Sequence, residues 1–386
     1  MIVEERGRLA VFVLGVMVVA AAAFAVDTTA IDAVLEKAKA DSASFGGADA
    51  AVVDEFLESA LGEMLTAKNF WEAVDLRGVI VDRQGDENMG RYRVEFLSSA
   101  RKHLQFAFEE VLRSEQDETQ MQKARTLIVL VGMIKDVSLA EFGIGLLDHP
   151  DSTVRYWAVK SIANPTIAAQ LKSVTPEVVQ AADKIVSGLE GAIEKEQYPE
   201  LLSQVVAFAG DLGGRFGKRL LLKIADKRIK SYEDWTVRYE LMDGEVLAEI
   251  GDMILAENPG QDRADLCRRF GQLYSYVIQR YMLGKDVLNE SQQEQLVSVM
   301  VEVEQSVVSK LLGTPRANMK KWIERKSAVA LKSEHKSLLG DSSQAGELAT
   351  RLNFDYGKDS GGGAITAPLE LKQPPAKPGD SAETQE

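Results

Sequence analysis

The sequence LAEFGIGLLDHPDSTVRYWAVKSIA, residues 139–163, decides how this chain folds. Its first part places apolar residues at the spacing of one helix face, at Leu139, Phe142, Gly143, Leu146 and Leu147. Pro150 ends this helix, because proline disfavours helical geometry in the residue before it. Asp151 or Ser152 can cap a following helix by accepting a hydrogen bond from one of its free backbone N–H groups. The stretch therefore predicts a helix, a tight turn and a second helix.

The second helix carries Val154, Ala158 and Ile162 at intervals of four residues, and Asn164-Pro165 ends it. Two short helices joined by so few residues lie antiparallel. Neither helix can bury its apolar face alone, so helices of the same kind must pack beside them. The stretch thus predicts a chain built from successive helix pairs.

Residues 146–163, LLDHPDSTVRYWAVKSIA, resemble the turn and second helix of a HEAT repeat. The matching positions are Leu146, Leu147, Asp151, Val154, Arg155, Ala158 and Ile162. The resemblance covers Met121 to Lys172, whereas Trp157 and the Asn164-Pro165 break depart from the family pattern. It implies an all-α fold, a HEAT-like α-α superhelix or solenoid.

The resemblance also implies roles for single residues. In HEAT repeats an Asp and an Arg often pair between successive repeats, so Asp151, Val154 and Arg155 are expected to be structural. We expect Arg155 to pair with an acidic group of its own or the preceding turn, such as Asp148 or Asp151. Because such repeats are mostly scaffolds, the resemblance implies binding to another protein.

The composition agrees with a large helical protein. The chain has 386 residues, of which 45% are hydrophobic, and its formal net charge is −14. This acidic balance argues against general nucleic-acid binding, which requires a basic surface. Runs with strand periodicity are scarce, and the expected helices lengthen after residue 236. We therefore predict an all-α fold whose C-terminal part is more bundle-like.

The N-terminus has the pattern of a targeting segment. Leu9–Ala25 is uninterrupted apolar sequence, and Ala23-Phe24-Ala25 fits a signal-peptidase site, so residues 1–25 are expected to be removed. The alternative is an uncleaved anchor in the inner membrane, formed by residues 9–25. Cys267 is the only cysteine and is expected to be a buried structural thiol. Export with so little cysteine indicates a bacterial periplasm or cell surface.

The rest of the chain divides by composition into three parts. An N-terminal helical region spans residues 26–119 and ends at an acidic stretch, and the HEAT-like region spans residues 120–339. Residues 340–386, with three consecutive glycines and a proline-rich end, are expected to be a disordered tail. Within this tail Leu352–Tyr356 is the one apolar piece, which can dock back onto the fold or bind a partner.

The sequence lacks the residue spacing of known catalytic and metal-binding motifs. The histidines His103, His149 and His335 occur in unrelated contexts, and no G-x-S-x-G nucleophile motif occurs. Gly213–Lys218 lacks both the first glycine of a phosphate-binding loop and the Ser or Thr after its lysine. No cluster has the spacing of a zinc site. The sequence therefore predicts a protein that is not an enzyme and has no cofactor or metal.

Two basic stretches stand out in this acidic chain. Residues 215–230 hold seven basic residues against one acidic residue, and residues 316–336 hold seven against two. The first interpretation is a solvated helix face balanced by acidic neighbours. The second is a docking strip for an anionic partner, either an acidic protein or lipid headgroups, made of Arg215, Lys218, Arg219, Lys223, Arg316, Lys320 and Lys321.

Two functions follow from these patterns. The first is a non-enzymatic helical-repeat scaffold that mediates protein–protein interaction in the bacterial envelope. The alternative is an enzyme or small-molecule binder with a pocket among the longer C-terminal helices. Its aromatic walls would be Trp235, Tyr274 and Tyr281, and its carboxylates Glu240 and Asp243.

Overall fold

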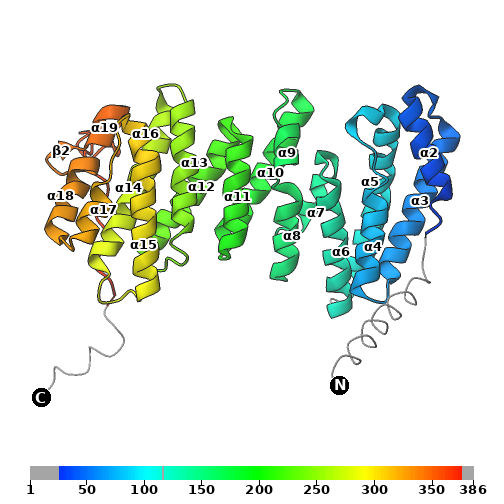
Figure 1. Ribbon diagram of the computed structural model, residues 1–386, viewed down its shortest axis with the longest axis horizontal. Coiled ribbons are helices and arrows are strands. Elements are labelled where there is room, and N and C mark those ends of the chain that lie inside the picture. Colours follow the sequence, from blue (N-terminus) through cyan, green and yellow to red (C-terminus); the bar gives the residue numbers. More distant parts are fainter. Residues whose placement is uncertain (1–25, 115–116, 376–386) are drawn as a thin grey trace, which may run out of the picture. The chain divides into compact units, whose positions relative to one another are not determined.

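The computed structural model describes residues 26–114 and 117–375. Within these residues the regular structure is almost entirely helical, and the only named strands form one pair of two-residue strands (Figure 1). The prediction of an all-α fold is confirmed. The predicted signal peptide, residues 1–25, lies outside the described residues. No helix among the described residues is both long and apolar enough to span a membrane.

The chain divides into two compact units between Ile134 and Lys135, not between residues 119 and 120 as the sequence suggested. The difference arises because helix α6, Glu118–Ile134, packs on α4 and α5 of the first unit. Its buried residues Leu127 and Val131 complete the core of that unit. The boundary that the sequence suggested therefore falls within the first unit.

The first unit is a cluster of helices around α3. Helix α3 contacts α2, α4 and α5, and α6 closes the group against α4 and α5. The helical segments of this unit are α2 (Thr29–Ala40), η1 (Ser42–Ser44), α3 (Gly47–Thr66), α4 (Phe70–Val81), η2 (Glu87–Met89), α5 (Gly90–Arg113) and α6 (Glu118–Ile134).

The second unit begins with the quoted stretch, which forms α7 (Ala140–Gly145) and α8 (Ser152–Ile162) after a short turn η3 (Val137–Leu139). Asp151 caps α8, because its carboxylate accepts a hydrogen bond from the Val154 backbone N–H at 2.8 Å. Gly143 lets the two helices approach closely, since a Cβ there would lie 2.5 Å from the Ser161 hydroxyl. Asn164 and Pro165 then end α8 and begin α9 (Pro165–Gln170). The predicted helix, turn and helix are confirmed.

The following helices pack in a regular order. They are α10 (Pro176–Lys195), α11 (Pro199–Leu212), α12 (Gly214–Glu233), α13 (Met242–Ala256) and α14 (Gln261–Leu283). One row of contacts runs from α8 to α11 to α13, and a second row runs from α10 to α12 to α14. The rows touch where consecutive helices meet, at α11 with α12, α12 with α13 and α13 with α14.

Helix α14 is the centre of the C-terminal part. It packs on α12 and α13 and also contacts α15, α18 and α19. The segments that follow it are α15 (Glu290–Glu302), the π-helical turn η4 (Val303–Val308), α16 (Ser309–Leu312), α17 (Asn318–Glu324), α18 (Ala328–Leu339), β1 (Gly340–Asp341), β2 (Gln344–Ala345) and α19 (Glu347–Leu352). The two strands are antiparallel and pair Gly340 with Ala345.

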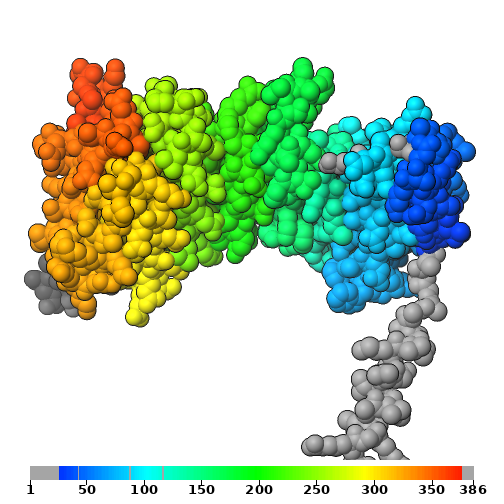
Figure 2. Space-filling model, turned by 45° about the horizontal axis from the view of Figure 1, so that its top comes forward, coloured from blue at the N-terminus to red at the C-terminus, as the bar shows by residue number. Residues whose placement is uncertain are grey.

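Residues 340–375 differ from the expected disordered tail, because they fold onto helices α14, α16 and α18. Leu348 of α19 and Leu371 are 1% and 5% exposed. Tyr356 packs so closely on α14 that a Cβ at Gly271 would lie 2.7 Å from its hydroxyl oxygen. Leu352–Tyr356 thus docks back onto the fold, one of its two expected behaviours. Figure 2 shows these residues, in orange and red, packed against the yellow helices without a gap.

Candidate functional site

The loop between α12 and α13, residues 234–241, has a strained backbone. Trp235 and Tyr239 have φ values of 56° and 60°, a left-handed conformation that side chains other than glycine rarely adopt. Each such residue costs about 1 kcal/mol or more and persists only where its surroundings hold it. Arg228 of α12 provides part of that support, because its guanidinium donates to the carbonyls of Arg238 and Tyr239 at 3.0 and 3.4 Å.

Arg228 also forms a buried bidentate ion pair with Asp243, in the first turn of α13. The Nε–Oδ1 and Nη2–Oδ2 distances are 2.6 and 2.9 Å, and Asp243 is fully buried. The Tyr232 hydroxyl donates to the same carboxylate at 2.6 Å. Burial, and then the Asp243 charge, raise the pKa of Tyr232 far above its ordinary range. Burial alone would lower the pKa of Arg228, but the Asp243 carboxylate outweighs it and raises that pKa. The three groups therefore form a fixed support for the loop.

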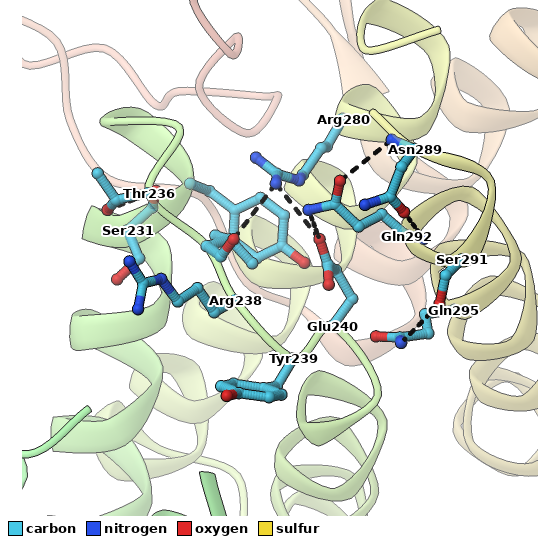
Figure 3. Close-up of polar contacts among 12 residues, drawn as sticks. Ser231, Thr236, Arg238, Tyr239, Glu240, Arg280, Asn289, Ser291, Gln292 and Gln295 are labelled. Carbon is cyan, nitrogen blue, oxygen red and sulfur yellow. Dashed lines mark hydrogen bonds and ion pairs between the residues drawn. The ribbon is translucent and has the colours of Figure 1, made fainter. Parts of the chain in front are cut away.

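A second buried ion pair, between Arg280 and Glu240, involves the same loop (Figure 3). Arg280 of α14 donates through Nη2 to Glu240 at 3.3 Å and to the Val237 carbonyl at 3.4 Å. Gln292 of α15 also donates to Glu240, at 3.4 Å. The Arg280 guanidinium lies 5.1 Å from the centre of the Trp235 ring. Its Nε and Nη1 atoms are buried and have no hydrogen-bond partner among the described residues.

This arrangement separates the members of the predicted C-terminal pocket. Glu240 pairs with Arg280, which also lies against Trp235, but Glu240 and Asp243 are 1% and 0% exposed and engaged in ion pairs. Tyr274 is fully buried and donates to the Met300 carbonyl at 2.8 Å, while Tyr281 is half-buried. The two carboxylates therefore stabilise the loop and are closed to a substrate arriving from solvent.

The face of α14 that carries Gln272 and Gln279 holds residues 369–372 of the C-terminal region. Gln272 accepts from the Leu369 backbone N–H at 2.8 Å and donates to the carbonyl of the same residue at 3.3 Å. Gln279 accepts from the Leu371 N–H at 2.7 Å and also donates to the Leu369 carbonyl, at 3.1 Å. Trp235 donates to the Lys372 carbonyl at 2.9 Å. We call these three side chains the backbone clamp.

The side chains of the clamped segment divide into two kinds. Pro368 and Leu371 are buried, whereas Leu369 is 57% exposed and Glu370 is also exposed. The clamp therefore contacts the main chain of the segment and encloses only two of its side chains. Sequence reasoning missed this site. Its signal is the polar pair Gln272 and Gln279, seven residues apart on one face of α14.

His335 of α18 is connected to the clamp residue Gln279 through the hydroxyl of Ser275. Its Nε2 lies 2.8 Å from the Ser275 hydroxyl oxygen, which in turn accepts from Gln279 at 2.8 Å. Burial, followed by the neighbouring Lys336 and Lys332, lowers the pKa of His335 to about 4. At neutral pH the ring is uncharged, so Ser275 can donate to its Nε2 while accepting from Gln279.

The first half of the predicted basic strip is matched by acidic neighbours. Lys218 is buried against Asp262 at 2.5 Å, and Arg219 binds Asp183 and Glu190 of α10 at 2.7 and 2.6 Å. The two remaining residues of this half are Lys223, which pairs with Glu194, and Arg215, whose guanidinium lies 4.5 Å from the centre of the Phe216 ring.

The second half of the strip has a similar character. Arg316 pairs with Glu334 and Glu347. The remaining two residues are Lys320, which lies 4.0 Å from Glu324, and Lys321, which lies 4.2 Å from the centre of the Trp322 ring. These contacts agree with the interpretation of the strip as a balanced surface, and its binding to an anionic partner stays a prediction.

The predicted repeat residues Val154 and Arg155 have the burial and contacts expected of structural residues. Val154 is fully buried in the seam of α8. Arg155 donates through Nε to Glu196 at 3.1 Å and through Nη1 to the carbonyls of His149 and Pro150. Glu196, at the end of α10, was not among the partners expected from the sequence. It also accepts from the backbone N–H of Tyr198 at 3.1 Å, so the pair positions the turn that leads into α11.

A surface cleft of about 340 Å³ lies between the first turns of α8 and α11. Its walls are Ser152, Thr153, Tyr156, Tyr198, Glu200 and Leu201. Tyr198 is 52% exposed, and Tyr156 is half-buried with its ring against Trp157 at a centroid distance of 5.5 Å. The cleft therefore presents aromatic and apolar side chains to solvent on a rigid frame.

The described part of the chain contains no group of three or more His, Cys, Asp or Glu side chains arranged to hold a metal ion. Comparison with known proteins adds no functional assignment. No model of a protein family matches the chain, and no curated protein matches it.

Proposed function

We propose that this chain is an exported scaffold that binds another protein through the surface of a HEAT-like helical solenoid. The observation that carries the proposal is the regular packing order of the second unit, in which α8, α11 and α13 contact one another in sequence beside α10, α12 and α14. Helices stacked in this way present extended, rigid outer surfaces. The HEAT resemblance of residues 121–172 supports the same role.

The cleft between α8 and α11 is the docking place we propose for the partner. Tyrosine is enriched at protein interfaces, because it combines a large apolar ring with a hydroxyl that hydrogen-bonds at the edge. Tyr156 and Tyr198 supply two such rings, and Leu201 adds an apolar wall. The Arg155–Glu196 pair holds the turn beneath Tyr198, so the cleft does not have to be ordered on binding.

Site-specific photo-crosslinking in the native cell tests this proposal. A benzophenone amino acid replaces Tyr198 in one variant and Tyr239 in the control variant, since both tyrosines are 52% exposed and only Tyr198 lines the cleft. We expect a discrete protein adduct from position 198 and none from position 239. The substitution Tyr156→Ala should remove the adduct at 198. Equal adducts from both positions, or no adduct from either, contradict the proposal.

Export is the second part of the proposal. The apolar run before Ala25 supports it, and Val26 is 7% exposed with α2 beginning three residues later, at Thr29. Cleavage after Ala25 would therefore leave the described fold complete. N-terminal sequencing of the protein from a cell-envelope fraction should give Val26 as the first residue. An intact Met1 in the membrane fraction would favour the anchor formed by residues 9–25.

A further inference from the structure

The backbone clamp binds its segment in a way that does not depend on most of the segment's sequence. All five hydrogen bonds described for the clamp join a side chain of Gln272, Gln279 or Trp235 to a main-chain group of residues 369–372. Main-chain groups are the same in every extended peptide that lacks proline at the donor positions. Hydrogen bonds to the main chain give affinity in such recognition, and pockets for particular side chains give specificity.

We propose that the face of α14 that carries Gln272 and Gln279 is a peptide-binding groove, that Pro368–Lys372 is its resident ligand, and that a segment of a partner protein with the pattern Pro-x-x-Leu exchanges with it. The pattern follows from burial, because Pro368 and Leu371 are enclosed while the two residues between them are exposed. Proline also fixes its own backbone near the extended conformation, which lowers the entropy lost on binding.

Exchange is feasible because the segment has a separate anchor. Arg268 of α14 binds both the main-chain and side-chain oxygens of Asp355, at 2.7 and 2.9 Å, and Tyr356 packs on Gly271. These contacts hold the chain on α14 at Arg268 and Gly271, just before the clamp residue Gln272, and do not involve residues 368–372. The resident segment can therefore leave the clamp while residues 355–356 stay bound.

A competing peptide must bind tightly enough to displace a resident segment that is tethered to the site. A segment joined to its site by a short linker acts at an effective concentration of about millimolar. A free peptide of the same sequence should therefore bind the intact chain weakly and bind a chain with a disabled resident segment tightly. The inference rests on the proposed role in protein binding only for the identity of the competitor, since the groove can be tested with a synthetic peptide.

The probe is a fluorescent peptide with the sequence of residues 367–375, APLELKQPP, and its binding is measured by anisotropy. The releasing variant is Leu371→Lys, which places a charge where a buried leucine lies. The matched control is Leu369→Lys, because that leucine is 57% exposed and its main-chain bonds are unchanged. The groove variants are Gln272→Ala and Gln279→Ala, each combined with Leu371→Lys.

We expect Leu371→Lys to bind the probe about tenfold more tightly than the wild-type chain, and Leu369→Lys to match the wild type. Adding Gln279→Ala or Gln272→Ala should remove that gain. A folded Leu371→Lys protein that binds the probe no better than wild type overturns the proposal. So does a gain that survives both glutamine substitutions. If the wild-type chain forms a dimer and Leu371→Lys dissociates it, the exchanging segment comes from a second copy of the chain. That result overturns the proposal that a partner protein supplies it.

A second measurement covers the case in which Leu371→Lys does not fold. Native-state hydrogen exchange of the wild-type chain compares the backbone N–H of Leu371 with those in the middle of α14. If the segment detaches, the Leu371 N–H exchanges through a local opening, at least about tenfold faster than the α14 core. If the N–H of Leu371 and those of α14 exchange only through global unfolding, the proposal is overturned, since the segment is then a fixed part of the core. Neither measurement involves the α8–α11 cleft, so the two proposals fail separately.

Discussion

The Nε of Arg155 lies 3.1 Å from Oε2 of Glu196, and this contact joins the first turn of α8 to the end of α10 across forty-one residues of sequence. Glu196 is only 4% exposed, whereas Arg155 is half-buried. The pair is therefore unlike an exposed surface ion pair, because removing the arginine leaves a carboxylate that water cannot fully solvate. Its position beneath Tyr198 links the stability of the HEAT-like stretch to the geometry of the proposed cleft.

Arg155→Ala should destabilise the protein by about 2 kcal/mol or more, because it removes the ion-pair partner of the buried Glu196 carboxylate. The control is Lys195→Ala, one residue earlier in sequence, whose ion pair with Asp148 is 66% exposed on both sides. That substitution should cost about 0.5 kcal/mol or less. Urea unfolding measures both values. Equal losses would contradict the assignment of a buried structural role to Arg155.

Asp151→Ala should cost about 1 kcal/mol through the lost cap of α8. Val154→Asp should be far more damaging, about 3 kcal/mol or more, because it buries an unpaired charge at a residue with no exposed surface. Thermal denaturation ranks the two variants. If Val154→Asp left the melting temperature unchanged while Asp151→Ala removed a binding activity from folded protein, this stretch would be a site and not a structural element.

Asp243→Asn should destabilise the second unit by about 3 kcal/mol, because Arg228 then stays charged and buried without its bidentate partner. Asp234→Asn is the matched control, since that carboxylate is 47% exposed and lies 3.2 Å from an exposed lysine, so its loss should be within about 0.5 kcal/mol. The double substitution Arg228→Met with Asp243→Leu should recover most of the stability by replacing the pair with apolar groups. A double variant as unstable as Asp243→Asn would show that the loop depends on the bonds from Arg228 to its carbonyls.

The stability of the protein should depend on His335 between about pH 6.5 and pH 4. Burial lowers the pKa of this histidine in the folded state to about 4, below its value near 6.5 in an unfolded chain. Between these two values the unfolded state binds more protons, so the free energy of unfolding falls as the pH is lowered through this window. The loss from this group is at most about 3 kcal/mol. His335→Gln should lose less stability than wild type over this window, and parallel curves for the two proteins would contradict the prediction.

Several features follow from the sequence because they depend on residues within about four positions of one another. The helical class, the cap at Asp151 and the end of α8 before Asn164-Pro165 arise from local periodicity and local hydrogen bonds, and the structure confirms each of them. Cys267 is likewise buried on the apolar stripe where the pattern placed it, and burial raises the pKa of its thiol to about 11. Local free-energy differences of this kind are already present in a single helix and its turn.

Other features are decided only by the packing of distant elements. The partner of Arg155, the acidic groups that face Lys218 and Arg219, and the closure of Glu240 and Asp243 to solvent depend on which helix lies beside which. The backbone clamp joins Gln272 and Leu369 across ninety-seven residues, so no local pattern reveals it. Packing on α14, α16 and α18 likewise orders residues 340–375, whose composition predicted disorder. Composition describes what a segment can bury by itself, whereas the fold supplies the surface of α14 against which that segment is held.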